Sequence, residues 1–357
     1  MIVAGGTGGH LFPGIALGEA LKSRGREVMF VSGMRKVEEY IFSQNGITPL
    51  KLDVEGFVGR RVFNKFQAGY KLIKAVFRAM KIIKGYDPDV VFATGGYVSV
   101  PVIAAARLLN RVTGLHEQNS IPGVANRVLG KMVDRVFVSI KGSESWFPQE
   151  KVVFSGNPVR ESLIKSLSSR REKKGLGLLI LGGSQGARAI NELALEVVPD
   201  LLEEFKELRV IHQTGMDHYE RVLEDYKKRL KVFDRLEVFP FIKDMGWAYS
   251  QADLVISRSG ATTLAELFAA GLPAIFIPFP YATHDHQKKN AEAVVKQGGA
   301  LLFLEREVTP QELKKTVTEL LSSPERLKKM AKAMKSMFVP NASEIIIDNM
   351  ERLVKNA

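Results

Sequence analysis

A histidine closes a glycine-rich segment near the amino terminus. Residues 3–10 read Val-Ala-Gly-Gly-Thr-Gly-Gly-His, so His10 follows a strand-like run and precedes a helical pattern. An imidazole titrates near neutrality, which makes His10 a candidate general base at the carboxyl end of a strand. The same residue could only cap a helix or donate to the backbone, and the motif by itself leaves both roles open.

Three glycine-rich turns stand between a strand-like run and a helical pattern, at 5–9, 95–96 and 182–186. Such a turn lets backbone N–H groups approach a phosphate, and the dipole of the following helix favours the negative charge. Close strand–helix packing explains any single copy equally well. The turns lack the GxGxxG spacing and the Gly-Lys-Ser/Thr ending, which disfavours dinucleotide oxidoreductases and P-loop NTPases.

A second polar group follows the strand-like run at 254–257. Ser259, Thr262 and Thr263 are cap-type residues that leave N–H groups for a phosphate. Glu266 could accept hydrogen bonds from a ribose diol, or only stabilise the helix dipole. The polar segment at 283–290 predicts a site that forms hydrogen bonds with sugar hydroxyls.

Metal chemistry has weak sequence support. Asp87-Pro88-Asp89 spells the DxD of some cation-binding enzymes, but it precedes the strand at 90–94 and is interpreted as a turn. His284 and His286 have no obvious third ligand, so hydrogen bonding is the favoured role. The chain has no cysteine, which excludes disulfides, thiolate–zinc sites and cysteine nucleophiles.

Short β-branched runs alternate with amphipathic stretches, a pattern typical of parallel α/β units. Strands are predicted at 1–4, 27–31, 90–94, 113–117 and 135–139, and then at 177–181, 209–213, 236–239, 254–257, 274–277 and 300–304. Helices are predicted at 13–24, 187–202, 262–270 and 342–354.

The strand–glycine turn–helix pattern occurs twice, because residues 180–187 repeat residues 3–10 about half a chain later. A length of 357 residues also suggests two domains at about 150 residues each. We therefore predict two tandem Rossmann-like domains. The first spans 1–156 and is completed by the last helix at 341–357, and the second spans 157–340.

The composition is that of a globular chain, with 45% hydrophobic and 25% charged residues. The longest uncharged runs, 90–106 and 267–283, are broken by glycine and proline and are shorter than the ~20 residues of a membrane span. No signal peptide is recognisable at the amino terminus. We expect a cytoplasmic protein that does not cross a membrane.

The net charge of +12 favours a polyanionic partner, which could be nucleic acid, an anionic membrane or a phosphorylated substrate. Residues 56–86 hold eight basic side chains and no acidic one. On a helix, Lys71, Lys74, Arg78 and Lys81 form one stripe, opposite a face with Leu72, Ile73, Val76, Met80 and Ile83. Large apolar residues outside that face include Phe63, Phe66, Phe77 and Ile82. This pattern fits an anionic membrane surface, and a solvated helix face is the alternative.

Several long motifs carry a resemblance to a known family. They read GGTGGHLFPG, GGYVSVP, HEQNSIPGVANR, GNPVR, GGSQGARAIN, and RSGATTLAELFAAGLPAIFIPFP followed by HQKKNA. In these motifs the chain resembles the MurG family, the peripheral-membrane N-acetylglucosaminyltransferases of bacterial peptidoglycan synthesis. The resemblance implies a GT-B fold, with two Rossmann-like domains and a cleft between them. It also implies inverting transfer of GlcNAc from UDP-GlcNAc to the MurNAc 4-hydroxyl of undecaprenyl-pyrophosphoryl-MurNAc-pentapeptide (lipid I), which gives lipid II.

The resemblance also implies roles for individual residues. His10 becomes the leading candidate for the general base, with Glu117 in reserve. The donor sugar and the acceptor would be met by Thr7, Gly8, Gly9, Asn119 and Asn126. The nucleotide or its diphosphate would be held by Arg160, Ser184, Gln185 and Gly186, and Ile242 would pair through its backbone with uracil. Phosphate and ribose would be held by Ser259, Gly260, Ala261, Thr262, Thr263, Leu264, Ala265 and Glu266, and Gln287 would read GlcNAc hydroxyls.

The expected partners follow from this family. They are UDP-GlcNAc, lipid I and the anionic inner leaflet at the cytoplasmic face of the bacterial inner membrane, together with proteins of cell-wall synthesis or division. No metal cofactor is expected, because loop N–H groups, helix termini and Arg160 can stabilise a departing diphosphate. Nucleic acid is not an expected partner, since no recognition motif is present. On the same fold, a UDP-GlcNAc 2-epimerase and a glycolipid synthase are the alternative functions.

Overall fold

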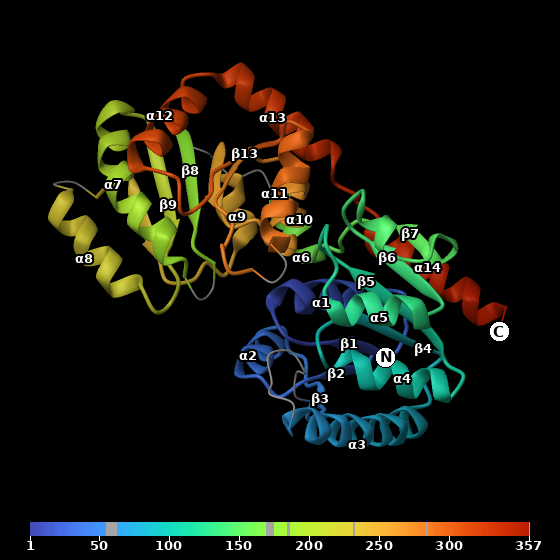
Figure 1. Ribbon diagram of the computed structural model, residues 1–357. Coiled ribbons are helices and arrows are strands. Elements are labelled where there is room, and N and C mark those ends of the chain that lie inside the picture. Colours follow the sequence, from blue (N-terminus) through green and yellow to red (C-terminus); the bar gives the residue numbers. More distant parts are fainter. Residues whose placement is uncertain (55–62, 169–174, 184–185, 231–232, 283–284, 357) are drawn as a thin grey trace. The chain divides into compact units, whose positions relative to one another are not determined.

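The structure is a computed structural model that describes residues 1–54, 63–168, 175–183, 186–230, 233–282 and 285–356 (Figure 1). The chain divides into two compact units, of which unit 1 is Met1–Glu161 with Val339–Ala357, and unit 2 is Ser162–Phe338. The first boundary thus lies five residues beyond the one expected at 156. The reason is local: the Arg160 guanidinium lies 4.7 Å from the centre of the Phe12 ring in unit 1.

In the described residues, unit 1 is built on a parallel sheet of seven strands in the order β3-β2-β1-β4-β5-β6-β7. The strands are β1 (Ile2–Ala4), β2 (Phe30–Ser32), β3 (Leu50–Lys51), β4 (Val90–Gly95), β5 (Val112–Glu117), β6 (Arg135–Val138) and β7 (Val152–Phe154). The helices are α1 (Gly8–Ser23), α2 (Lys36–Gln44), α3 (Phe63–Tyr86), α4 (Ser99–Leu108), α5 (Val124–Met132) and α14 (Ala342–Lys355), with 3₁₀ turns η1 (Ser143–Trp146) and η2 (Gln149–Lys151).

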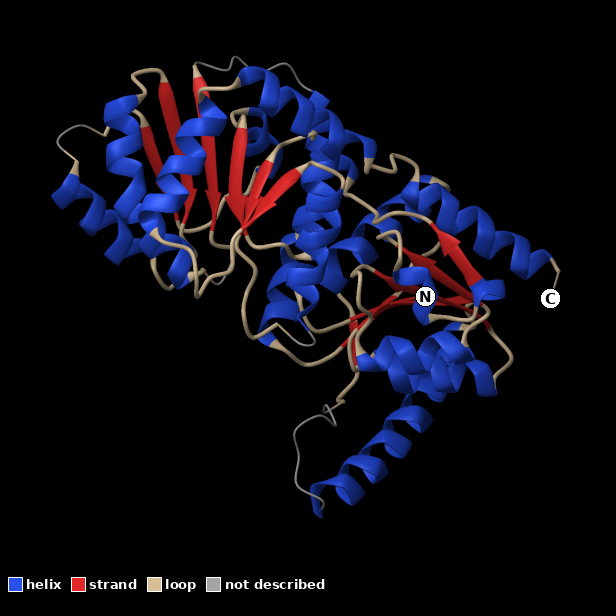
Figure 2. Cartoon of the chain, turned by 45° about the horizontal axis from the view of Figure 1, so that its top comes forward, coloured by secondary structure: helices blue, strands red, loops and turns tan. Residues whose placement is uncertain are grey.

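Successive strand residues of unit 1 enter two different cores, because side chains alternate across a sheet. Val3 and Val91 belong to a cluster with α3, α4 and α5, whereas Ile2 and Phe92 belong to a cluster with α1, α2 and α14. Helices therefore cover both faces of the sheet, as Figure 2 shows. Burial on both faces explains why the strands read as nearly continuous apolar runs.

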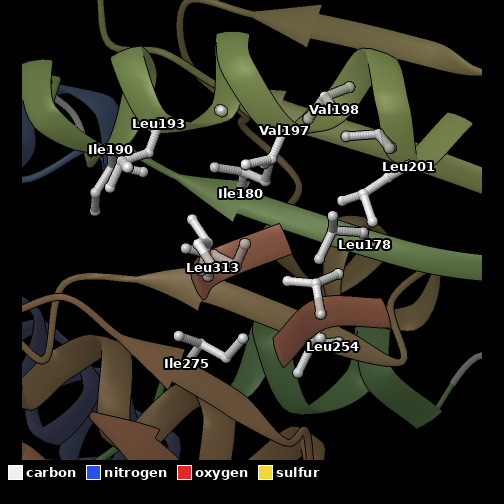
Figure 3. Close-up of a cluster of buried hydrophobic side chains, with 14 of the residues drawn as sticks. Leu178, Ile180, Ile190, Leu193, Val197, Val198, Leu201, Leu254, Ile275 and Leu313 are labelled. Carbon is white, nitrogen blue, oxygen red and sulfur yellow. The ribbon is translucent and has the colours of Figure 1, made fainter. Parts of the chain in front are cut away.

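Unit 2 repeats this arrangement with a parallel sheet of six strands in its described residues, in the order β10-β9-β8-β11-β12-β13. The strands are β8 (Leu176–Leu181), β9 (Leu208–Gln213), β10 (Leu236–Phe239), β11 (Leu254–Ser257), β12 (Ala274–Phe276) and β13 (Ala300–Leu302). The helices are α6 (Glu161–Ser168), α7 (Arg188–Glu204), α8 (Tyr219–Arg229), α9 (Met245–Ser250), α10 (Ala261–Ala270), α11 (His286–Lys296), α12 (Pro310–Leu321) and α13 (Pro324–Ser336). Figure 3 shows Val197 and Leu201 of α7 packed over the strand side chains of this core.

Both sheets reverse their strand order once, between β1 and β4 in unit 1 and between β8 and β11 in unit 2. The prediction of two Rossmann-like units is confirmed. In such sheets the crevice at the carboxyl ends of the strands, beside the reversal, is where ligands bind. The predicted glycine turns follow β1, β4 and β8, so they stand at these positions.

The structure corrects several predicted elements. Strands β3 and β7 were not expected, since they are two- and three-residue edge strands with too little pattern to detect. Strand β2 begins at Phe30 and not at residue 27, and its first ladder bond runs from the Ile2 N–H to the Met29 carbonyl oxygen. Helix α1 begins at Gly8 and not at residue 13. Its glycines disfavour a helix by propensity, but the N–H groups of His10 and Leu11 donate to the Thr7 carbonyl and start it early.

The turn after β4 provides a test of the fold. Gly96 has a φ of +85°, and a Cβ there would collide with the carbonyl oxygen of Gly5. We expect Gly96→Ala to lower the free energy of unfolding by about 1–3 kcal/mol, through backbone strain and the forced displacement of Gly5. Urea denaturation measures this change. The control is Gly85→Ala in α3, where a Cβ meets nothing within 4 Å and should stabilise the helix by up to ~1 kcal/mol. Equal stability of the two variants would contradict the interlocked turns.

Candidate functional site

The first candidate site lies at the carboxyl edge of the unit 1 sheet. The turns after β1 and β4 interlock there, because Gly96 packs directly on the backbone of Gly5. A third segment, residues 117–119, follows β5 at the same edge. The predicted residues Thr7, Gly8 and Gly9 lie in the first of these turns and at the start of α1, and the Thr7 side chain is exposed.

His10 lies in the first turn of α1, where it faces the turn after β4. Its Nδ1 is 2.9 Å from Oε1 of Gln118, and the Thr94 hydroxyl donates to the His10 carbonyl oxygen at 2.7 Å. Burial lowers the pKa of the imidazole, and the interactions of the ring with the Gln118 side chain and the Thr94 backbone only partly offset that effect. His10 is therefore neutral at physiological pH, the state that a general base requires. The ring fits because residue 95 is glycine, since a Cβ there would lie 2.6 Å from Nδ1.

Glu117, the reserve base, is only 1% exposed. Its Oε1 accepts hydrogen bonds from the backbone and side-chain nitrogens of Asn119, at 2.9 and 3.1 Å. Its Oε2 accepts one from Nδ2 of Asn126 at 2.8 Å. Burial raises the pKa of the carboxyl, against the effect of these donors. Both oxygens of Glu117 therefore hold asparagines that were predicted to meet the substrates. The choice of the base between His10 and Glu117 stays a prediction.

Sequence reasoning missed Glu38 of α2, which anchors the first glycine turn. Its Oε1 accepts a hydrogen bond from the Gly6 N–H at 2.6 Å, and the side chain is 3% exposed. Nothing in the local sequence separates Glu38 from the solvated acids of an amphipathic helix. Gln118 was also missed, because its partner His10 is 108 residues away along the chain.

The second candidate site lies at the carboxyl edge of the unit 2 sheet, around the start of α10. The N-cap residue of this helix is Gly260, and no side chain caps the helix by a hydrogen bond. The Ser259 hydroxyl donates instead to the carbonyl oxygen of Gln287 at 2.7 Å, and Nδ2 of Asn290 donates to the Ser259 carbonyl at 3.2 Å. The structure thus brings together Ser259, Gln287 and the start of α10.

Glu266 is 8% exposed and lies in the second turn of α10, where the Tyr249 hydroxyl donates to its Oε2 at 2.9 Å. Tyr249 was not singled out from the sequence. Thr262 and Thr263 are partly exposed, and Ala261, Leu264 and Ala265 are buried. A ligand at this turn would therefore meet the threonines and backbone N–H groups of the helix terminus.

Within the described residues, a hydrogen bond is shown for one of the two backbone polar groups of Ile242. Its N–H donates to Oε1 of Gln213 at 2.8 Å, and the side chain is 4% exposed. Pairing with a nucleobase through this N–H would require Gln213 to move away. The Ile242 carbonyl is the group that can pair without such a displacement.

Some predicted residues lie outside the described part of the chain. These are Ser184, Gln185 and His284. Gly186 is described and has a φ of +87°, and a Cβ there would lie 2.6 Å from the Thr214 carbonyl oxygen. The phosphate-binding prediction for the turn at 182–186 therefore stays a prediction.

No group of three or more potential metal-ligating side chains occurs among the described residues. Asp87 and Asp89 precede β4 at the amino end of the strand, and Asp87 adopts a φ of +52° and pairs with Arg111. This placement agrees with the interpretation of the DxD segment as a turn.

Helix α3 presents a mixed basic and apolar surface. Lys71, Lys74, Arg78 and Lys81 are exposed, as expected. Phe77 is 62% exposed, but Ile73, which was assigned to the core face, is 59% exposed.

Two further outcomes concern the same helix. The prediction of Ile82 as an outward apolar residue is wrong, because it packs against the buried cluster of unit 1. Ala75, Ala79 and Ile83 form the buried face of α3, so small residues set the packing direction and shift the face from the one that residue size suggests. Phe63 and Phe66 belong to α3, in the turns whose side chains the structure does not describe. Among the described helices, none is both long enough and apolar enough to span a bilayer.

Family comparisons agree with this architecture. Residues 1–138 match the family model described as "Glycosyltransferase family 28 N-terminal domain". Residues 177–346 match the model described as "Glycosyltransferase family 28 C-terminal domain". Two Rossmann-like units with these matches define the class, a two-domain glycosyltransferase with the GT-B fold.

The relatives define the family more narrowly. A protein of Geobacter metallireducens named UDP-N-acetylglucosamine–N-acetylmuramyl-(pentapeptide) pyrophosphoryl-undecaprenol N-acetylglucosamine transferase is 38% identical, over 98% of this chain and 97% of its own length. The crystal structure of Acinetobacter baumannii MurG superposes with a TM-score of 0.77 and 32% identity, covering 99% of this chain and 98% of that one. The chain belongs to the MurG family. A UDP-GlcNAc 2-epimerase of Neisseria meningitidis bound to UDP-GlcNAc reaches a TM-score of 0.69 at 15% identity, over 98% of this chain and 99% of its own, which is a likeness of fold alone.

The histidines of the unit 1 site make stability depend on pH. Burial lowers the pKa of His116 to about 4, against ~6.5 in an unfolded chain. Between these values the unfolded state binds more protons than the folded state, so stability falls as the pH drops from 6.5 to 4. The full loss is on the order of 3 kcal/mol for this group. Urea unfolding at pH 7 and pH 4.5 measures it, and His116→Gln should have a smaller difference between the two. An undiminished difference would contradict the assignment to His116.

Proposed function

We propose that the protein transfers GlcNAc from UDP-GlcNAc to the MurNAc 4-hydroxyl of lipid I, with inversion, and so forms lipid II in peptidoglycan synthesis. Family membership over nearly the whole chain supports the activity. The observation that carries the chemistry is His10, a neutral imidazole with one nitrogen anchored to Gln118, beside two interlocked glycine turns. The epimerase alternative has only a likeness of fold in its favour.

In the proposed reaction the acceptor binds at unit 1 and the donor at unit 2. His10 takes the proton of the acceptor 4-hydroxyl as its oxygen bonds to the anomeric carbon of GlcNAc. The bond from that carbon to the diphosphate breaks, and UDP leaves with the electron pair. A single displacement of this kind inverts the anomeric centre and requires no covalent nucleophile on the protein.

The donor contacts follow from the unit 2 site. Glu266, held by Tyr249, would accept hydrogen bonds from the ribose hydroxyls, and the start of α10 would face the diphosphate. Oε1 of Gln287 already accepts from the Phe279 N–H at 3.0 Å, so its amide NH₂ is the group for a sugar hydroxyl. Arg160 and helix termini would supply the positive potential, so the proposed reaction needs no metal ion.

The test of this function is the transfer of labelled GlcNAc to a lipid I analogue. We expect His10→Ala to lower kcat by ~10²–10⁴-fold with little change in the KM for UDP-GlcNAc, because it removes general-base help only. Glu266→Ala should mainly raise the KM for UDP-GlcNAc. The control Glu325→Ala, at an exposed position of α13, should resemble the wild type. A His10→Ala enzyme with full kcat would place the base elsewhere.

The same assay tests the metal requirement. Transfer should continue in excess EDTA. In a separate thermal-shift experiment, UDP should raise the Tm of the protein with and without EDTA. A loss of turnover that Mg²⁺ or Mn²⁺ restores would contradict the metal-free mechanism. Conversion of UDP-GlcNAc without an acceptor would instead indicate the epimerase.

We further propose that unit 1 binds the anionic cytoplasmic surface of the inner membrane through α3, while UDP-GlcNAc, lipid I and proteins of cell-wall synthesis or division are its other partners. The exposed Lys71, Lys74, Arg78 and Lys81 support this proposal, together with the exposed rings of Tyr70 and Phe77. Cations near such a surface contribute ~1 kcal/mol each, and apolar side chains add burial at the headgroup boundary. Nucleic acid is not part of the proposal.

Reversal of these four cations to glutamate should abolish binding to anionic liposomes, with a loss of about 4 kcal/mol at ~1 kcal/mol per cation. Sedimentation with vesicles of defined composition measures the binding. The matched control reverses Arg326, Lys328, Lys329 and Lys332, which are exposed on α13 and change the net charge equally. Turnover of a short-chain, water-soluble acceptor should survive both sets. Equal effects of the two reversals would show that only net charge matters, and would contradict the proposal that α3 binds the membrane.

A further inference from the structure

A buried glutamine connects the candidate base to the interior of unit 1. Gln118 is 1% exposed and lies directly after β5. Its Oε1 is 2.9 Å from Nδ1 of His10, and its Nε2 donates to the carbonyl oxygen of Thr94 at 2.7 Å. The two ends of one amide therefore contact the candidate base and a backbone carbonyl of β4.

The orientation of this amide is fixed by the Thr94 carbonyl, which can only accept hydrogen bonds. If the amide were reversed, Oε1 would lie at the distance of 2.7 Å from another acceptor, a repulsive contact in a buried place. The NH₂ group must therefore face Thr94, and Oε1 must face His10. Since an amide oxygen can only accept, the proton between Gln118 and His10 belongs to Nδ1 of His10.

A second histidine supports the same orientation. Nε2 of His116 is 3.1 Å from the carbonyl oxygen of Gly156, which can only accept, and 2.9 Å from the Ser139 hydroxyl, which can also accept, so a proton on Nε2 suits both neighbours. Nδ1 of His116 then has a lone pair, and Nε2 of Gln118 donates to it at 3.0 Å. Burial lowers the pKa of His116 to about 4, which keeps this acceptor available at neutral pH.

We propose that Gln118 is a positioning residue that holds His10 in the tautomer with its proton on Nδ1, so that Nε2 presents the lone pair that accepts the substrate proton. Each group donates to the next in one direction, from His10 through Gln118 and His116 to the carbonyl oxygen of Gly156. No hydrogen bond joins Nε2 of His10 to any described residue, so this nitrogen is the one left for a substrate. The inference deepens the proposed function and rests on it, because it takes His10 as the base.

The energetic reason lies in the two tautomers of a neutral imidazole, of which only one has its lone pair on Nε2. Without an acceptor at Nδ1, the ring can place its proton on either nitrogen and can also rotate. In enzymes with a catalytic triad, loss of the group that fixes the histidine tautomer lowers kcat by as much as ~10⁴-fold. An amide is a weaker acceptor than the carboxylate of a triad, so we expect a smaller effect here.

The first experiment is Gln118→Met, which keeps the length of the side chain and removes its hydrogen bonds. We expect kcat to fall by ~10–10³-fold with little change in the KM for UDP-GlcNAc. The decisive variant is Gln118→Met combined with His10→Ala. If Gln118 acts only through His10, the double variant should be no slower than His10→Ala alone. Losses that multiply, or a Gln118→Met enzyme with full kcat, would overturn the proposal.

The matched control is Gln149→Met. Gln149 also donates its amide to two backbone carbonyls of unit 1, at 2.9 and 3.2 Å, and has no contact with His10 among the described residues. It should retain the wild-type kcat. A fall as large as that of Gln118→Met would show that the loss of a side-chain amide in unit 1, and not of the contact with His10, lowers kcat.

The second experiment reads the tautomer directly and needs no turnover. In ¹⁵N-histidine-labelled wild type, the resonances of His10 are those absent from the His10→Ala spectrum. We expect a protonated Nδ1 and an unprotonated Nε2 at pH 7, and a mixture of tautomers in Gln118→Met. A proton on Nε2 in the wild type would overturn the inference even if transfer is observed. Absence of GlcNAc transfer with the expected tautomer would instead count against the proposed function alone.

Discussion

The contact between the backbones of Gly5 and Gly96 governs the geometry of unit 1. Strands β1 and β4 are neighbours, and the helices that follow them belong to clusters on opposite faces of the sheet. The two turns therefore face each other with no room for a side chain at Gly96. The space above Gly95 is what the His10 ring occupies, so the position of the candidate base depends on a contact between two glycines.

In both candidate sites, buried side chains hold groups that would meet a ligand. Gln118 is hydrogen-bonded to His10, and Glu38 is hydrogen-bonded to the first glycine turn. Tyr249 is hydrogen-bonded to Glu266. Such groups are costly to bury unless every partner is present, and when the partners are present they fix one geometry. Much of the precision of the sites therefore comes from residues that do not meet the ligand.

The dependence of the sites on these supporting hydrogen bonds explains which features the sequence could predict. Glycine turns, apolar strands and amphipathic helices are local patterns, so the two Rossmann-like units and the turns at β1, β4 and β8 were predictable. The longest motifs also carried the family. Gln118 and Tyr249 were not predictable, because their partners lie 108 and 17 residues away and only the fold brings them together. Ile73 and Ile82 were assigned to the wrong faces of α3 because small buried alanines, and not the large residues, define its packed side.

His212 and His10 show what separates a structural imidazole from one that can react. In unit 2, His212 contacts the Tyr226 hydroxyl through Nδ1 and Oδ1 of Asn191 through Nε2, each at 3.0 Å. It is fully buried, and burial lowers its pKa to about 3, so it remains neutral and has no nitrogen left for a ligand. His10 is also kept neutral by burial, but the protein occupies only its Nδ1 in the described residues. The same physical effect that makes His212 inert therefore leaves His10 with an unprotonated nitrogen at the edge of the sheet. The number of ring nitrogens that the protein itself satisfies, and not the shift of the pKa, is what distinguishes the two.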